Sequence, residues 1–450
     1  MTTTVSSTEL RTRFAARLSA LYGGEVPAYN TLVQVSQEVN QRVMVRRGAD
    51  AARLGSIDRV TAERHGAIRV GSPRELEQVS RVFGALGMFP CGFYDLRDAA
   101  PAPIPVVSTA FRPLDRAELA ANPFRVFTSV LVPEDRRFFD ADLEGRLQNF
   151  LEARQLFPPE LLALADRAIE HGELADGDAD RYLDLATASF ALSPEPVDRS
   201  WYAELERVSG VAADIGGVTT THINHLTPRV LDIDDLYASM QARGIEMIDE
   251  IQGPPRWKGP DVLLRQTSFR ALSEPRRFRD PDGSVSEGAL RVRFGEVEAR
   301  GIALTPAGRD RFDELTAEVD RRLAADPSLR RIDVAPQVWA QGFPTTEREL
   351  CAQGLGFFTF SVDDATGELL PEPIVYEDFL PRSAAGIFAS NLTDRGSMDA
   401  DHGGAERDAA WMAEAMGRTV NVPEEVYAEE SAASLKAAEA VLGRRIDQRS

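Results

Sequence analysis

Cysteine and long apolar runs are scarce in this sequence of 450 residues, which contains only Cys91 and Cys351. The two cysteines lie far apart and outside any C-x-x-C motif, so a disulfide scaffold and a zinc ribbon are both excluded. No run of about 18 apolar residues, the length of a membrane-spanning helix, is present, and Met1–Leu10 lacks the apolar core of a secretory signal. We therefore expect a cytoplasmic protein with reduced thiols.

Several widespread catalytic motifs are absent as well. The sequence has no G-x-x-x-x-G-K-[ST], no G-x-G-x-x-G after a strand, no H-E-x-x-H and no G-x-S-x-G, so the common nucleotide, zinc-protease and hydrolase sites are not predicted. Lys and Arg number 51 against 71 Asp and Glu, which gives a formal charge of −20. This charge repels nucleic acids and anionic membranes, so neither is expected as a partner. An anionic small substrate would have to be bound by local arginines.

The apolar pattern divides the chain into helical and strand-rich parts. Helical spacing before residue 64 indicates N-terminal helices, and short apolar segments after it indicate strands, with a helix over 73–86 capped by Ser72. A second strand-rich part follows a Leu- and Ala-rich stretch, and each part begins with a strand that bears a histidine. We predict an α+β fold with N-terminal helices on the core (1–64), a first half of the β core (65–139), a helical insertion (140–210), a second half of the β core (211–330) and a C-terminal segment that closes the pocket (331–450).

The chain has five histidines in which to look for metal or acid–base chemistry: His65, His171, His222, His225 and His402. His171 ends a polar helix and His402 lies in a glycine-rich loop, and both contexts are typical of solvated side chains. The β-branched stretch 219–228 favours a strand, in which His222 and His225 would face opposite sides. Only one of them is then expected to bind a metal, and a lone strand histidine is more often a structural residue.

Two further strand patterns carry candidate ligands. Alternation places His65, Ala67 and Arg69 on one face, where a metal ligand and an anion-binding arginine would share a cavity, although this segment taken alone favours an edge strand with two solvated cations. In the third strand, the glycine before Glu296 invites a bulge or a close approach, so the facing of the glutamates cannot be counted across it from Arg291 and Arg293, and either Glu296 or Glu298 would face inward. Two histidines and one carboxylate from separate strands form the facial triad of non-haem Fe(II) oxygenases.

Five blocks of sequence, in this order, resemble one protein family. They are His65–Arg69 (HGAIR), Thr221–Arg229 (THINHLTPR), Leu264–Phe269 (LRQTSF), Phe294–Gly301 (FGEVEARG) and Phe379–Leu392 (FLPRSAAGIFASNL). The set is similar to the bacterial 2-oxoadipate dioxygenase/decarboxylase family. The resemblance implies an elaborated vicinal-oxygen-chelate fold, in which a curved β-sheet with added helical segments surrounds a single Fe(II) ion.

The resemblance also implies roles for individual residues. His65, His225 and Glu296 would bind the iron, with Glu298 as the alternative carboxylate. Arg69 would bind the distal carboxylate of the substrate and Ser383 would line the substrate pocket, whereas the neighbouring Arg382 differs from the apolar residue expected there.

The reaction implied by the resemblance converts 2-oxoadipate and O2 into 2-hydroxyglutarate and CO2, in lysine catabolism. Two alternatives stay open. One is a metal-dependent lyase or isomerase of the same fold that acts on a 2-oxo acid without O2, and the other is a binding module without catalysis. The sequence leaves the chain length of the substrate, the stereochemistry of the product and the oligomeric state undetermined.

Overall fold

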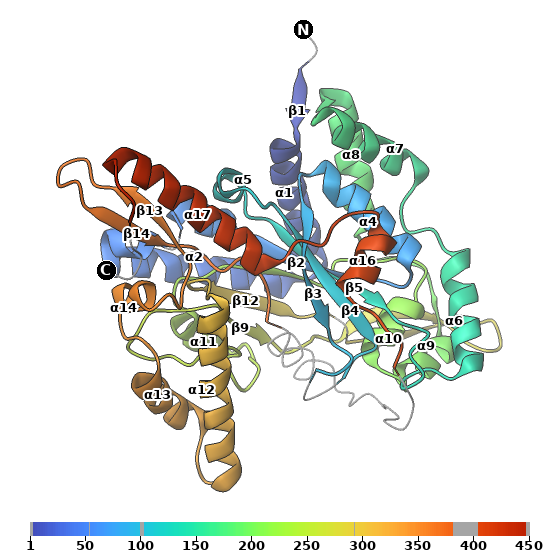
Figure 1. Cartoon of the computed structure of the whole chain (residues 1–450). Helices are drawn as coiled ribbons and strands as arrows, with labels where there is room; N and C mark the ends of the chain where they lie inside the picture. Colours follow the sequence, from blue (N-terminus) through green and yellow to red (C-terminus); the bar gives the residue numbers. More distant parts are fainter. Residues whose placement is uncertain (1–2, 54, 100–102, 292, 381–403, 447–450) are drawn as a thin grey trace.

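Long helices precede the first strand of the central sheet, as the apolar spacing predicts (Figure 1). They are α1 (Ser7–Glu25) and α2 (Pro27–Arg47), followed by a short 3-10 helix (Gly48–Ala52) and α3 (Ile57–Ala62). The structure is a computed structural model that describes residues 3–53, 55–99, 103–291, 293–380 and 404–446. In the described part, no helix combines the length and the apolar character that a membrane crossing requires.

A mixed sheet of five strands lies at the centre, in the order β3-β4-β5-β2-β8. Its strands are β2 (Arg64–Val70), β3 (Phe89–Asp95), β4 (Val106–Arg112), β5 (Arg125–Leu131) and β8 (His225–Pro228). β2 runs parallel to β5 on one side and antiparallel to β8 on the other. The strand that carries His65 is therefore internal, and the edge-strand alternative for this segment is wrong.

Two units that each begin with a strand followed by a helix build this region. The first contains β2, α4 (Pro73–Ala85), β3, β4 and β5, and its last strand returns parallel to its first. The second contains β8, α11 (Ile233–Gln241), β9 (Leu264–Phe269) and β12 (Gly295–Arg300), and a parallel bridge joins β12 to the residue that follows β8. Because β2 and β8 pair antiparallel, the first strands of the two units meet, with Ala67 opposite His225.

The helix α4 begins where the sequence predicts. The hydroxyl of Ser72 accepts a hydrogen bond from the backbone N–H of Glu75 over 3.3 Å, which satisfies one of the free donors of the first turn. Pro73 occupies the first helical position, where its missing N–H costs nothing.

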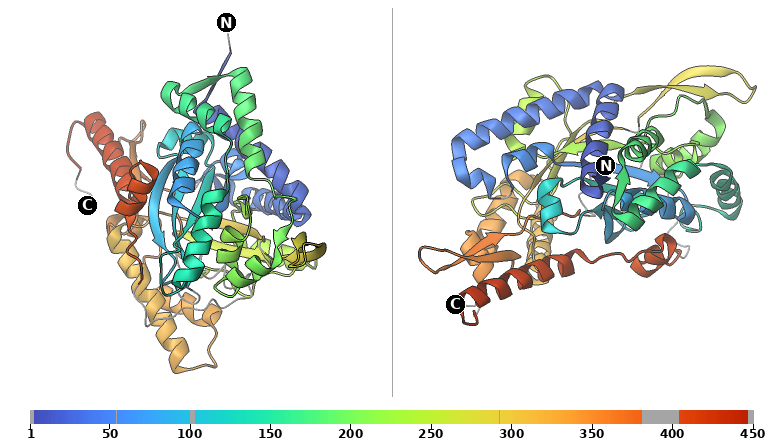
Figure 2. Two further views of the ribbon diagram at one scale, coloured as in Figure 1. Left: turned by 90° about the vertical axis from the view of Figure 1, so that its right-hand side faces the viewer. Right: turned by 90° about the horizontal axis from the view of Figure 1, so that it is seen from above.

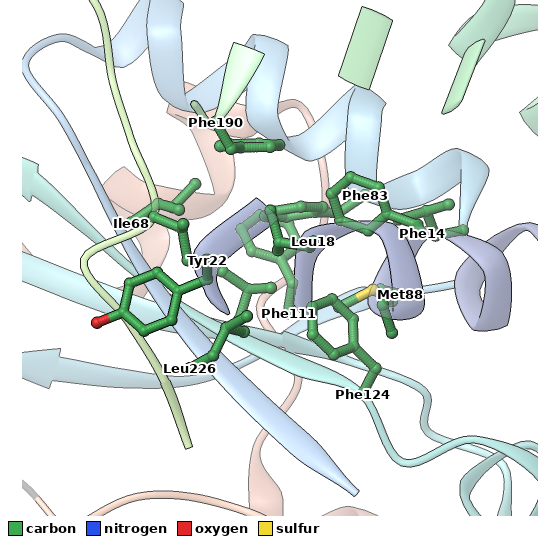
Figure 3. Close-up of a cluster of buried hydrophobic side chains, with 14 of the residues drawn as sticks. Phe14, Leu18, Tyr22, Ile68, Phe83, Met88, Phe111, Phe124, Phe190 and Leu226 are labelled. Carbon is green, nitrogen blue, oxygen red and sulfur yellow. The ribbon is translucent and has the colours of Figure 1, made fainter. Parts of the chain in front are cut away.

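One face of the sheet packs against α1 and α4 through aromatic and aliphatic side chains (Figure 3). These include Phe14, Leu18 and Tyr22 of α1, Phe83 of α4, and Ile68, Phe111 and Leu226 of the sheet. Ile68 and Val70 of β2 belong to this core, whereas Ala67 belongs to a second cluster with Phe127 and Phe379. The alternation predicted for β2 is thus confirmed, and the face of His65 and Arg69 is the one opposite α1.

Helices occupy the stretch between the two units, and short strands accompany them. They are α6 (Ala141–Ala153), α7 (Pro159–His171), α8 (Asp176–Ser189), α9 (Arg199–Glu206) and α10 (Gly210–Gly216), with β1 (Thr4–Ser6) pairing β6 (Glu173–Ala175). The short helix α5 (Arg116–Ala121) lies within the first unit, between β4 and β5. A hairpin of β10 (Glu274–Arg279) and β11 (Val285–Leu290) pairs with β7 (Val197–Asp198) and projects from the body, as Figure 2 shows in yellow in its right-hand view.

The C-terminal part contains helices and one hairpin of two antiparallel strands. Its elements are α12 (Pro306–Ala325), α13 (Arg331–Gly342), α14 (Glu347–Ala352), β13 (Phe358–Val362), β14 (Leu369–Pro373), α16 (Ala409–Met416) and α17 (Pro423–Leu442). The helix α17 packs against β13 (Figure 1).

Candidate metal centre

Three buried side chains from three different strands converge on the face of the sheet opposite α1. His65 of β2, His225 of β8 and Glu296 of β12 offer ligand atoms that all lie within 4.8 Å of one another. The Nε2 atom of His65 lies 3.4 Å from Oε1 of Glu296, and Nε2 of His225 lies 3.5 Å from Oε2 of the same carboxylate. Two imidazoles and one carboxylate are a donor set that suits a divalent transition metal with coordination positions left open.

The state of His225 fits a metal ligand. Both of its ring nitrogens are buried, and neither has a hydrogen-bond partner within the described residues. Burial, with the nearby charges of His65 and Arg69, holds the pKa of His225 well below its usual range, so the ring is neutral and its lone pair is available. Buried polar atoms are normally satisfied, and coordination to a metal would satisfy one of these two nitrogens.

Glu298 contacts the other nitrogen of His65. Its Oε2 atom lies 2.7 Å from Nδ1 of His65, and Arg300 donates to both of its carboxylate oxygens over 2.7 and 2.9 Å. Burial lowers the pKa of His65, but the carboxylates of Glu298 and Glu296 outweigh it and raise this pKa above its usual value. The structure therefore places Glu296 in the three-residue cluster and Glu298 beside it, where it orients the imidazole.

A buried ion-pair network lies around Glu298. Arg125 contacts Glu63 over 2.7 Å and also pairs with Glu377, while Arg229 contacts the second oxygen of Glu63 over 2.8 Å. Burial would raise the pKa of Glu63, but Arg229 and Arg125 hold it well below its usual range. These carboxylates are thus ionised, and the backbone around His65 is held by charge-assisted contacts.

Arg69 lies on the same face of β2 as His65 and is buried. Its Nη1 atom donates to Oδ2 of Asp214 on α10, and the side-chain amide of Asn224 donates to the same oxygen over 2.8 Å. The Arg69 charge contributes to the lowered pKa of His225, so it lies close to the cluster. Asp214 is not among the residues predicted from the sequence, because it lies in a short helix without a motif and only its burial distinguishes it.

The prediction of a continuous strand over 219–228 is wrong at its N-terminal end. The strand β8 begins at His225, because the preceding polar groups bond elsewhere: the Thr221 hydroxyl donates to the Arg69 carbonyl, and the Ile223 N–H donates to the Phe190 carbonyl. His222 lies 3.4 Å from Asp214, and burial lowers its pKa to about 4. His222 therefore stays outside the cluster, as expected for one of the two histidines, although its position before the strand and not strand alternation is the cause.

The remaining candidates lie elsewhere. His171 is exposed at the end of α7, as predicted. His402, Arg382 and Ser383 lie outside the described residues, so the structure does not place them.

Comparison with known proteins relates the whole chain to one group. A family model described as 2-oxoadipate dioxygenase/decarboxylase matches residues 14–391. The 2-oxoadipate dioxygenase/decarboxylase of Mycobacterium tuberculosis is 59% identical over 93% of this chain and 95% of its own length, and that of Pseudomonas putida is 38% identical over 96% and 97%. A crystal structure of the hydroxyglutarate synthase from Pseudomonas putida in complex with 2-oxoadipate superimposes with a TM-score of 0.84 and 36% identity, over 98% of this chain and 99% of that one.

Proposed function

Because the chain belongs to the 2-oxoadipate dioxygenase/decarboxylase family, we propose that it converts 2-oxoadipate and O2 into 2-hydroxyglutarate and CO2. The observation that carries this proposal is the convergence of His65, His225 and Glu296 within a buried site. A solved relative with 36% identity has 2-oxoadipate bound, which supports the substrate. We place the reaction in lysine catabolism, as the family resemblance implies.

The ion proposed for this site is Fe(II), with His65, His225 and Glu296 as its ligands. A ferrous ion bound here would supply the redox chemistry that the activation of O2 requires. Glu298 would fix the ring of His65 through Nδ1 and so direct Nε2 at the ion, because the second ring nitrogen of a metal-bound histidine is normally held by such a partner.

The aromatic side chains around the cluster would keep water out. The ring of Phe379 lies 5.0 Å from that of His65, and the ring of Phe294 lies 5.3 Å from that of His225, both measured between centroids. A dry site strengthens electrostatic contacts between the substrate and the charged groups of the protein.

Arg69 would bind the distal carboxylate of the substrate. It is a buried cation on the same strand face as His65, and Asp214 holds its Nη1 atom. A buried guanidinium can bind a carboxylate through two parallel hydrogen bonds, which matters in a protein whose formal charge of −20 repels a dianion. Ser383 remains proposed as a lining residue of the same pocket.

We also infer that the two units of the sheet are the paired modules of a vicinal-oxygen-chelate fold. Each unit begins with a strand and a helix and ends with a strand that returns parallel to the first, and the first strands of the two units pair antiparallel, which supports this interpretation. The proposed ligands come from the first strand of each unit and from the last strand of the second.

One experiment tests the reaction. The protein is loaded with Fe(II) without oxygen and then mixed with 2-oxoadipate and O2, and we expect equal amounts of O2 consumed, CO2 released and 2-hydroxyglutarate formed. Metal-dependent turnover without oxygen uptake would instead support the lyase or isomerase alternative. H225A should lose iron binding and turnover, whereas H171A, which removes an exposed histidine, should lose neither.

A further inference from the structure

A cavity of about 430 Å³ lies beside the Asp214–His222 pair. Its other walls come from Phe150 of α6, from segments within 192–198 and 217–220, and from the hairpin strands β10 and β11. The volume falls within the range of about 300–1,000 Å³ typical of small-molecule sites. The three proposed metal ligands do not line it, so the cavity is a separate space next to the metal centre.

Each acidic side chain in the wall of this cavity is already bonded within the protein. Asp214 accepts hydrogen bonds from Arg69 and Asn224. Asp198 caps α9 by accepting from the Trp201 N–H over 2.9 Å, and Glu195 accepts from the Thr219 hydroxyl over 2.9 Å. The negative charges of the wall are therefore engaged with protein donors.

The cavity wall also contains two arginines, Arg276 and Arg279, which, unlike its acidic residues, are not bonded to protein groups in the described part of the chain. Neither guanidinium makes a hydrogen bond or an ion pair with any residue that the structure describes. Arg276 is half-buried, and burial lowers its pKa, an effect that Glu274 only partly offsets. A half-buried cation without a direct partner is stabilised when an anion enters the cavity.

Arg276 also lies close to the proposed substrate-binding residue. Asp214 is ion-paired with Arg69 and is near enough to Arg276 to affect its pKa. Burial raises the pKa of Tyr202, and the charges of Arg69 and Arg276 both act against this rise, so Tyr202 lies near both arginines. Asp214 thus stands next to two cations, one on the metal side and one in the cavity.

We propose that this cavity is a second anion-binding site, which takes short dicarboxylates and through which 2-oxoadipate reaches Arg69, with Arg276 binding the carboxylate on entry. This inference rests on the proposed function for the identity of the substrate. The existence of the anion site itself rests only on the cavity and its charges.

Binding of adipate to the full-length, metal-free protein tests the site without turnover. Adipate is a dicarboxylate without the 2-oxo group, so its binding does not depend on chelation of a metal. We expect R276A and R276Q to weaken adipate binding about ten- to hundredfold in calorimetric titrations, the range of a lost charge-assisted hydrogen bond. The matched control is R277A, which removes the same charge from the adjacent, exposed position of β10 and should leave the affinity unchanged.

Unchanged adipate affinity in both Arg276 variants would overturn the proposal. An equal loss in R277A would also overturn it, because the effect would then come from the net charge alone. The use of two substitutions, one of which keeps a polar side chain, protects the result against a variant that fails to fold.

Steady-state kinetics test the entry role. We expect R276Q to raise KM for 2-oxoadipate about tenfold or more with kcat within twofold, and to change KM much less for 2-oxohexanoate, which lacks the distal carboxylate. Equal changes in KM for both substrates would contradict the entry role. If the wild-type protein does not turn over 2-oxoadipate at all, the proposed function fails, whereas the adipate titration still decides whether the cavity binds dicarboxylates.

Discussion

The Nδ1 atom of His65 lies 2.7 Å from Oε2 of Glu298, while Nε2 of the same ring lies 3.4 Å from Oε1 of Glu296. One imidazole is thus placed between two carboxylates of a single strand. Because residues two apart in a strand share a face, the two glutamates can serve one ring in different ways. Glu298 holds the ring, and Glu296 completes the cluster with His225.

These different roles of Glu296 and Glu298 predict different outcomes when each is replaced by glutamine. E296Q should abolish stoichiometric binding of Fe(II), because it removes the charged ligand atoms. E298Q should keep the site but weaken its affinity about 10- to 100-fold, the usual effect of losing the partner of a metal-bound histidine. Anaerobic titration against a competing chelator measures both. E287Q, on the exposed strand β11, serves as the control, and a site that survives E296Q but not E298Q would reverse the assignment.

The sequence could place His65 and Arg69 together because strand alternation is a local property. It could not decide between Glu296 and Glu298, because residues two apart in a strand share a face, and the preceding glycine also allowed a bulge. The structure has no register shift in this strand pair: β12 pairs with β9 residue by residue from Gly295 to Arg300. The glycine serves close approach instead, since a Cβ at Gly295 would lie 1.8 Å from the ring of Phe269.

Asp214 and the break before His225 depend on contacts between distant segments. The carbonyls of Arg69 and Phe190 accept hydrogen bonds from the residues just before β8, so the strand begins only at His225. Both acceptor residues lie more than 30 positions away in the chain. No local pattern encodes such partners. For the same reason, the sequence did not predict Asp214 as the partner of Arg69.

Removal of Arg69 should weaken substrate binding and leave the metal in place. A charge-assisted hydrogen bond is worth about 1.5–3 kcal/mol, so R69A should raise KM for 2-oxoadipate with an unchanged iron content. D214N should act in the same direction, because it loosens the guanidinium. The two changes should be less than additive, so that R69A/D214N is no worse than R69A, and kcat/KM for all four proteins measures this. Fully additive losses would mean that Asp214 acts independently of Arg69.

Stability in acid should depend on Glu377. Burial alone would raise its pKa, but Arg59 and Arg125 lower the pKa of Glu377 to about 2. The pKa of a glutamate in the unfolded chain is about 4.3. The Glu377 carboxylate therefore stabilises the fold above that pH, and its contribution is lost as the pH falls toward 2. Urea midpoints measured from neutral to acidic pH should therefore decline over this window.

The variant E377Q should separate this effect from general acid unfolding. It should be less stable than the wild type by about 3–5 kcal/mol at neutral pH, because Arg125 and Arg59 lose a buried partner. Its midpoints should also decline less between about pH 4.3 and 2. E372Q, which changes an exposed glutamate of β14, should follow the wild-type curve. Parallel curves for E377Q and the wild type would refute the role of this carboxylate.

Tyr427 of α17 holds the backbone that leads to the metal centre. Its hydroxyl donates to Asp378, which Arg112 contacts over 2.8 and 3.0 Å, and accepts from the N–H of Glu377 over 2.8 Å. Phe379, whose ring contacts that of His65, is the next residue in the chain after Asp378. Y427F should therefore cost about 1–3 kcal/mol of stability, since it leaves a buried N–H without an acceptor.

Hydrogen exchange locates the consequence of Y427F. Amide exchange should accelerate at residues 377–379 and in α17, while the strands that carry the proposed ligands keep their protection, because their ladders do not include this hydroxyl. Y237F, which removes a hydroxyl that donates to the Ile248 carbonyl over 2.8 Å, controls for the loss of a single tyrosine hydrogen bond elsewhere. Unchanged exchange at Glu377 in Y427F would mean that the Arg112–Asp378 ion pair alone fixes this segment, and that α17 docks without influence on the residues around His65.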